Sequence, residues 1–272
     1  MKIFVLAPKE DWICDRLVSE WYAAFPEFCT KNINDADIVW LLAGWCWNHL
    51  PVEILKNKKI IVTEHHIVPE KFTQQKYQNF MMRDQFVNCY HVPNEKTKSL
   101  LGQLTNKRIE VISYWYNDKL WYPIDKTKAR KELDLSIENY YIGSFQRDTE
   151  GSDLKTPKLE KGPDLFCDYL IRNRSKIEVA GELHVLLGGW RRQYVEGGPQ
   201  AIIEASSMKV PIISTDVGIA NQILHKNCII DIEKDYYVPN SKDLEYAFSK
   251  VSKLSIKRHG KKFIKLFKEV DI

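Results

Sequence analysis

Two glutamates, Glu196 and Glu204, frame the segment of this chain that is best suited to bind an anionic ligand. Gly197, Gly198 and Pro199 follow the first glutamate, and a short apolar run leads to the second. Proline fits the first turn of a helix without losing a hydrogen bond, and glycines before it let a ligand approach backbone N–H groups. Because a helix N-terminus attracts anions, phosphate above all, we expect a diphosphate at this helix start.

The spacing of the two glutamates indicates what else could bind there. Eight helical steps of about 1.5 Å span about 12 Å, which is near the length of a sugar nucleotide from its ribose to its sugar. We expect Glu204 to bind the ribose hydroxyls and Glu196 to bind the sugar hydroxyls. Any glutamate pair can match a spacing by chance, so an ordinary amphipathic helix with exposed glutamates is the alternative.

Four segments of the chain, this helix among them, form a set. They are residues 141–147 (Tyr-Ile-Gly-Ser-Phe-Gln-Arg), 160–164 (Glu-Lys-Gly-Pro-Asp), 196–205 (Glu-Gly-Gly-Pro-Gln-Ala-Ile-Ile-Glu-Ala) and 210–218 (Val-Pro-Ile-Ile-Ser-Thr-Asp-Val-Gly). As a set they resemble the donor-binding signature of glycosyltransferase family 4, whose members are retaining enzymes with two Rossmann-like domains, the GT-B fold. The resemblance covers residues 108–225 well and the N-terminal part in outline.

The resemblance implies which cations bind the diphosphate. In the family an Arg and a Lys reach the phosphates, and Arg147 and Lys161 match them here, with Lys158 as a substitute for Lys161. The two family residues usually lie close in sequence, whereas the polar stretch 148–158 separates them in this chain. Surface cations are the alternative. Gly218, in the turn after the last segment, is expected to border the donor.

Two histidines, His65 and His66, follow a strand expected at residues 59–63. In the resembled family a histidine near this place contacts the transferred sugar. Neighbouring side chains of an extended backbone point in opposite directions, so both cannot face a ligand. We favour His66 as the catalytic histidine, with His65 next. The alternative is a structural histidine bonded to backbone carbonyls.

Four tryptophans fall near the expected loops: Trp45, Trp47, Trp115 and Trp121. Aromatic faces stack on sugar rings, so Trp45 and Trp47 are candidates for a sugar contact, although tryptophan more often fills a core.

Two departures from the family pattern concern loop lengths and glycines. The loop after the first strand, Ala-Pro-Lys-Glu-Asp-Trp at residues 7–12, has no glycine. Residues 190–195 alone separate Gly189 from Glu196, where the family has further strands and a helix. We therefore expect a reduced second sheet, in an enzyme that is either naturally shortened or degenerate.

The composition of the chain restricts which other classes of protein it could belong to. The chain has 272 residues, of which 44% are hydrophobic and 28% charged, and its net charge of +4 does not favour nucleic acid binding. Its six cysteines suggest neither a zinc site nor a disulfide framework. We find no Asp-x-Asp pair placed to chelate a donor's metal and expect no metal and no cofactor. No apolar run is long enough to span a membrane, and we expect a cytoplasmic protein.

Apolar runs alternate with amphipathic stretches throughout, which predicts an α/β fold with parallel sheets. Strands are expected at 2–7, 37–42, 59–63, 89–92, 108–113, 140–144, 177–187 and 210–214. Helices are expected at 11–24, 70–86, 95–104, 127–132, 163–171, 199–208 and 219–224. We divide the chain into an acceptor-side domain at 1–117, a nucleotide-sugar-binding domain at 118–250 and a basic C-terminal helix at 251–272, with a hinge at 114–123.

The basic C-terminal helix has two interpretations. It is either a solvated helix packed on the body or a peripheral membrane contact, since Lys and Arg beside Phe and Leu suit anionic head groups.

The prediction for the whole chain is a metal-independent, retaining, hexosyltransferase-like glycosyltransferase. Its donor would be a UDP-, GDP- or ADP-sugar and its acceptor a glycan, a lipid-linked molecule or a small molecule. The alternatives are a catalytically impaired sugar-nucleotide-binding relative and a DNA-modifying glycosyltransferase that binds DNA through the basic C-terminus.

Overall fold

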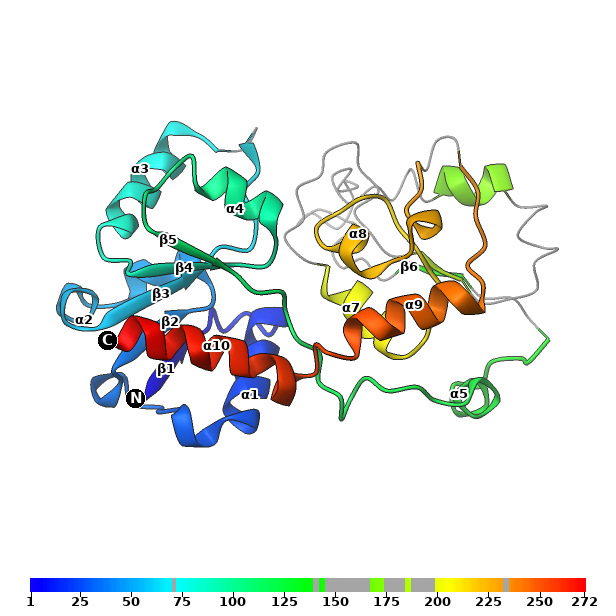
Figure 1. Cartoon of the computed structure of the whole chain (residues 1–272), viewed down its shortest axis with the longest axis horizontal. Coiled ribbons are helices and arrows are strands. Elements are labelled where there is room, and N and C mark those ends of the chain that lie inside the picture. Colours follow the sequence, from blue (N-terminus) through cyan, green and yellow to red (C-terminus); the bar gives the residue numbers. More distant parts are fainter. Residues whose placement is uncertain (70–71, 139–141, 145–166, 174–183, 187–198, 232–234) are drawn as a thin grey trace. The chain divides into compact units, whose positions relative to one another are not determined.

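The computed structural model divides the chain into two compact units (Figure 1). The first unit contains Met1–Trp115 and Ser255–Ile272, and the second contains Tyr116–Leu254. The residues described are 1–69, 72–138, 142–144, 167–173, 184–186, 199–231 and 235–272. The passage from the first unit to the second therefore falls within the stretch 114–123 that the sequence marks as a hinge.

The first unit is built on a sheet of five parallel strands in the order β1-β2-β3-β4-β5. Its strands are β1 (Ile3–Leu6), β2 (Ile38–Leu41), β3 (Lys59–Thr63), β4 (Cys89–Val92) and β5 (Arg108–Val111). All four residues of β2 and of β4 are buried, as expected for strands that are covered on both faces. The register aligns Leu6 with Leu41 and Leu41 with Val62, so three strands end together at one edge.

Helices cover both faces of this sheet. On one face, Val39 and Leu41 pack in a core with Leu55, Phe80 and Leu101. These last three come from α2 (Val52–Asn57), α3 (Gln74–Asp84) and α4 (Glu95–Leu101). On the other face lie α1 (Ile13–Ala24) and α10 (Ile256–Asp271), at the start and end of the chain (Figure 1). The helix α2 is not among the helices that the sequence predicts.

The C-terminal helix α10 belongs to the first unit, because the chain returns to this unit at Ser255. Phe263 and Phe267 are fully buried, with ring centroids 5.4 Å and 5.1 Å from that of Trp40. The apolar face of α10 is thus part of the core and is not available to insert into a lipid surface. Its exposed face carries lysines.

The second unit contains three parallel strands among its described residues, in the order β6-β7-β8. They are β6 (Ile142–Ser144), β7 (His184–Leu186) and β8 (Ile212–Ile213), each inside a predicted strand region. The helices are α5 (Lys126–Glu132), α7 (Gln200–Ser207), α8 (Ala220–Ile223) and α9 (Ser241–Val251), and residues 167–173 are also helical. The sequence predictions do not include α9, which begins with a capping box of Asn240 and Asp243. Tyr116 and Leu254, the first and last residues of the unit, are joined by a 3.1 Å backbone hydrogen bond.

Candidate active site

The candidate residues of the first unit follow the carboxyl ends of its parallel strands, the edge at which α/β sheets bind ligands. Trp45 and Trp47 lie in the 3₁₀ helix after β2, which spans Gly44–His49. His65 and His66 directly follow β3 and Glu64. These segments are therefore neighbours, because β2 and β3 pair along their length.

His65 is held by two hydrogen bonds. Its Nε2 donates to the carbonyl of Leu42 at 2.7 Å, and the hydroxyl of Tyr114 donates to its Nδ1. The Sγ of Cys14 lies 3.7 Å from Nε2. Burial lowers the pKa of this imidazole and outweighs the opposing effect of the Leu42 carbonyl. His65 thus bonds a backbone carbonyl, as expected for the structural alternative at this position.

His66 is exposed, whereas His65 points into the unit. The opposite directions follow from the extended backbone after β3, where successive side chains alternate. His66 is therefore the histidine of this pair that a ligand could reach. Its contact with a transferred sugar stays a prediction.

The tryptophans differ in their surroundings. Trp45 is 50% exposed. Trp47 is half-buried, and its indole N–H donates to Oδ1 of Asn79 at 3.2 Å. Trp115 is buried, and its N–H donates to the Glu20 carboxylate at 2.9 Å. Trp115 belongs to the core, and Trp45 is the one of these three that offers a ring face to a ligand.

A glycine fixes the path of the loop that carries Trp45. A Cβ on Gly44 would lie 2.6 Å from Nη1 of Arg83 and 3.0 Å from Cγ1 of Val62. Arg83 is buried beneath the loop and pairs with Glu64 at 2.6 Å. The absence of a side chain at residue 44 lets the loop lie close to this ion pair without displacing Arg83.

The glycine-free loop after β1 is shaped by a carboxylate. Asp15 accepts hydrogen bonds from the backbone N–H groups of Lys9 (3.0 Å), Glu10 (2.8 Å) and Trp12 (3.4 Å). Lys9 and Asp11 adopt φ values of 59° and 58°, in the left-handed region that usually favours glycine. Trp12 is 41% exposed on this loop. Trp12 is not among the residues predicted from the sequence to contact a ligand, although its position after a predicted strand indicates such a role.

In the second unit, Glu204 lies on α7 and is only 9% exposed. All six residues from Ile202 to Ser207 are buried, so α7 is enclosed around most of its circumference. The alternative of a helix with exposed glutamates is therefore wrong for Glu204. The half-buried Pro199 precedes α7 at its N-cap, as the sequence predicts for the start of this helix.

Gly218 lies in the turn after β8 and has a φ of 50°. A residue with a side chain would be strained there, which explains a glycine at this position without any ligand. The other donor-site candidates lie outside the described residues. They are Arg147, Lys158, Lys161, Glu196, Gly197 and Gly198.

Metal ligands do not gather in the described part of the chain. No group of three or more His, Cys, Asp or Glu side chains there is arranged to hold a metal ion. All six cysteines are unpaired thiols. The same described residues include no helix with the length and apolar character to cross a membrane.

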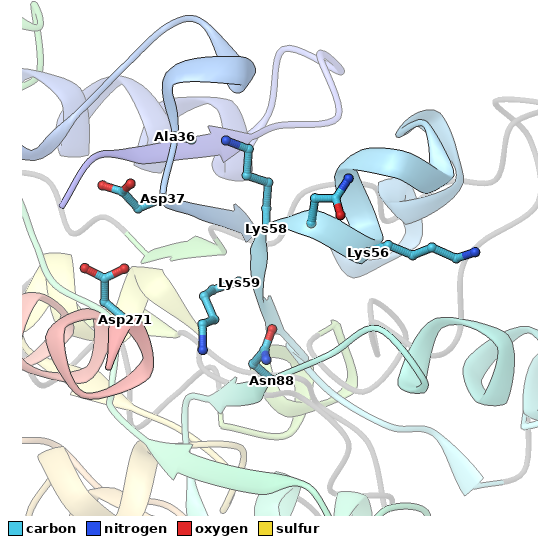
Figure 2. A pocket seen from close by; sticks show the side chains of 8 residues that line it. Ala36, Asp37, Lys56, Lys58, Lys59, Asn88 and Asp271 are labelled. Atoms are coloured by element: carbon cyan, nitrogen blue, oxygen red, sulfur yellow. The ribbon is translucent and has the colours of Figure 1, made fainter.

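A polar hollow of about 460 Å³ lies at the opposite edge of the first sheet, where β2 and β3 begin (Figure 2). Its lining mixes lysines with Asp37, Asn88 and Asp271. Asp37 accepts from the backbone N–H of Lys2 at 2.6 Å, and Lys58 donates to the carbonyl of Asn34 at 2.7 Å. The lining thus carries both positive and negative charges, and some of these groups already bond neighbouring backbone atoms. The hollow therefore does not match an anion site.

The chain as a whole is similar to solved glycosyltransferase structures. It matches HepE from Anabaena, solved with UDP and glucose, with a TM-score of 0.67 and 11% identity over 99% of this chain and 100% of HepE. The sucrose-phosphate synthase of Thermosynechococcus elongatus matches with a TM-score of 0.56 and 13% identity over 97% and 80% of the two chains. AviGT4, a glycosyltransferase involved in avilamycin A biosynthesis, matches with a TM-score of 0.55 and 11% identity over 100% and 98%.

At these identities the likeness shows the fold, which is the α/β fold of the GT-B glycosyltransferases and agrees with the sequence prediction. No family model matches the sequence. No similar sequence was found among curated proteins.

Proposed function

We propose that this protein transfers a sugar from a nucleotide-sugar donor to an acceptor. The observation that carries the proposal is the burial of Glu204 on α7, the helix that follows the Glu-Gly-Gly-Pro segment in the sequence. A carboxylate in a low-dielectric environment bonds hydroxyl groups more strongly than one in water. Glu204 is thus suited to bind the two adjacent hydroxyls of a ribose. The GT-B fold, shared over the whole chain, supports this assignment.

The proposal assigns a separate role to each group of candidate residues. Arg147 and Lys161, with Lys158 as a substitute, would stabilise the charge that develops on the leaving diphosphate. Gly197, Gly198 and Pro199 would present backbone N–H groups to the same diphosphate. Glu196 and His66 would hold the transferred sugar.

We further propose the finer features that the family 4 resemblance implies. These are a hexose donor carried by UDP, GDP or ADP, retention of the anomeric configuration, and no requirement for a metal or another cofactor. A cytoplasmic protein with peripheral membrane contact through α10 also belongs to this proposal. Since the apolar face of α10 is buried, that contact would be electrostatic.

A panel of UDP-, GDP- and ADP-sugars tests the function by calorimetry and donor hydrolysis. One nucleotide sugar should bind and be hydrolysed slowly, and Glu204→Gln should weaken its binding by roughly 1.5–3 kcal/mol. The matched control is Glu132→Gln, which changes an exposed glutamate of helix α5 in the same unit. Equal affinities in the wild type and Glu204→Gln would refute the ribose role.

Other outcomes separate the alternatives. Binding without hydrolysis or transfer would identify a catalytically impaired relative. A salt-sensitive affinity for DNA would favour a nucleic-acid-modifying enzyme. If no nucleotide sugar binds, the proposed function fails.

A further inference from the structure

Two exposed indoles stand out among the tryptophans of the first unit. Trp21, Trp40 and Trp115 are at most 1% exposed, whereas Trp12 and Trp45 are exposed by 41% and 50%. An indole ring has a large apolar face, so a ring left in water does not contribute much of the stabilising free energy that its burial would give. Both exposed rings lie on loops that follow strand carboxyl ends, after β1 and after β2.

The two loops lie close together, as several contacts indicate. The rings of Trp45 and His65 have centroids 6.0 Å apart, and the Nε2 of His65 lies 3.7 Å from the Sγ of Cys14. Cys14 is two positions from Trp12. In addition, burial raises the pKa of the Cys46 thiol, and the charges of Glu10 and Asp15 raise it further. The second loop is thus within electrostatic range of the first.

Both loops are held in place before any ligand arrives. The loop of Trp12 is pinned by three hydrogen bonds to Asp15 and contains two left-handed residues. The loop of Trp45 is anchored by the buried Cys46 and by the close approach of Gly44 to Arg83. A preorganised surface loses little conformational entropy on binding.

The polar groups beside the indoles restrict what could bind. Glu10 and Asp11 are exposed on the loop of Trp12, and His66 is exposed after β3. Two carboxylates repel phosphate and anionic head groups, but they accept hydrogen bonds from hydroxyls. A sugar ring combines an apolar C–H face with a rim of hydroxyls, and it therefore matches exposed indoles with carboxylates next to them.

We propose that Trp12 and Trp45 form an acceptor platform for a neutral carbohydrate, either a free oligosaccharide or the glycan part of a conjugate. This inference rests on the proposed function, and it narrows the acceptor to a glycan. Sugar rings stack on the indoles, and the carboxylates of Glu10 and Asp11 accept their hydroxyl hydrogens.

The test is direct binding of glycans, measured apart from the transfer reaction. The full chain is applied to an array of immobilised neutral and acidic oligosaccharides, and the strongest neutral hit is titrated by calorimetry with and without saturating UDP. Trp45→Ala and Trp12→Ala should each weaken the affinity roughly tenfold. Trp45→Phe, which keeps an aromatic face, should lose less.

Met82→Ala is the matched control. Met82 is also 50% exposed, but it lies near the end of α3 that leads to the amino end of β4. Its substitution should leave glycan affinity unchanged, and thermal unfolding verifies that every variant is folded.

Three results would overturn the inference. The array could show no binding to neutral oligosaccharides, or the Trp45 and Trp12 variants could bind the glycan as tightly as the wild type. The third is a protein that binds no glycan but self-associates, with the self-association abolished by Trp45→Ala. Failure here is distinguishable from failure of the proposed function. Nucleotide-sugar binding without glycan binding refutes the platform alone, and glycan binding without nucleotide-sugar binding refutes the transferase alone.

Discussion

His259 of α10 donates through its Nε2 to the backbone carbonyl of Ser113, 146 positions earlier in the chain, at 2.7 Å. The preceding carbonyl, that of Ile112, accepts from Nε2 of His91 at the same distance. Both histidines are buried. Two imidazoles, one from β4 and one from the C-terminal helix, thus fix the segment that leads from β5 to the second unit.

Acid should destabilise the first unit through these histidines and His65. Desolvation lowers the pKa of His91 to about 3 and that of His259 to about 4, and it also lowers the pKa of His65. In the unfolded chain the three titrate near 6.5. As the pH falls through this value, the unfolded chain therefore binds protons that the native state excludes. The stabilisation is complete above about pH 6.5 and is lost as the pH falls toward the folded pKa values.

Urea unfolding between pH 7.5 and 5 measures this effect. Each buried histidine should lower the free energy of unfolding by up to about 1.4 kcal/mol per pH unit below 6.5. His259→Gln should make the pH dependence shallower, whereas His49→Gln, at an exposed histidine, should not. A pH dependence identical in His259→Gln and the wild type would show that His259 does not stay neutral.

Gly260→Ala should destabilise the first unit, although alanine favours helices over glycine by about 1 kcal/mol. A Cβ at position 260 would clash with the ring of Phe25 and lie 3.4 Å from Cζ3 of Trp21. Overpacking of this kind costs about 1–3 kcal/mol. The contrast is Gly102→Ala, where the nearest atom is the Lys98 carbonyl oxygen at 3.3 Å. Thermal unfolding should show a lower midpoint for Gly260→Ala only, and equal midpoints would contradict the close packing of α10 on α1.

The order of strands and helices in the first unit could be predicted because its strands are long apolar runs. Val39, Leu41 and Ile60 belong to such runs, and buried parallel strands leave this signature.

Two helices of the structure are absent from the sequence predictions. No helix is predicted between the strands at 37–42 and 59–63, and the predicted C-terminal helix begins only at residue 251. The structure has α2 and α9 in these gaps.

The roles of individual site residues were harder to predict, because burial depends on contacts far apart in sequence. Nothing local to Trp115 reveals its hydrogen bond with Glu20, 95 positions away, so the sequence alone does not distinguish Trp115 from the tryptophans of the loops. His65 likewise depends on Tyr114, 49 positions later. Trp12 is not among the sequence candidates, because the loop after β1 lacks the glycines that mark a ligand-binding loop in the resembled family. Its left-handed turns are formed by Lys9 and Asp11 with the help of Asp15.

The lysine-rich face of α10 should bind anionic membranes through charge alone. Six cations on this helix are exposed: Lys257, Arg258, Lys261, Lys262, Lys265 and Lys268. Each lysine near an anionic surface contributes about 1 kcal/mol. Replacing Lys257, Lys261 and Lys262 by Gln should therefore weaken binding to vesicles of phosphatidylcholine and phosphatidylserine by roughly 100-fold.

Vesicle flotation at low and high salt provides the measurement. The control replaces Lys126, Lys128 and Lys131 by Gln, which removes the same charge from the exposed face of α5. Equal losses in the two triple variants would indicate attraction by net charge rather than by α10. Binding that resists high salt would contradict an electrostatic contact.

Substitutions of the two neighbouring histidines after β3 should affect different properties, stability at His65 and catalysis at His66. His65→Ala removes the donor to the Leu42 carbonyl and the acceptor for the Tyr114 hydroxyl, which should cost about 1–3 kcal/mol of unfolding free energy. His66→Ala changes an exposed side chain and should leave the unfolding midpoint unchanged. If His66 contacts the transferred sugar in the transition state, its loss should lower kcat for donor hydrolysis roughly 100-fold, with little change in nucleotide affinity.

The comparison requires both variants to be assayed well below their unfolding midpoints, so that unfolding does not reduce the rate. Under these conditions His65→Ala should keep most of its turnover, because its imidazole bonds only groups within the first unit. The opposite result, full turnover in His66→Ala and none in folded His65→Ala, would move the catalytic assignment to His65. Its hydrogen bonds to Leu42 and Tyr114 would then have to break or rearrange when the sugar binds.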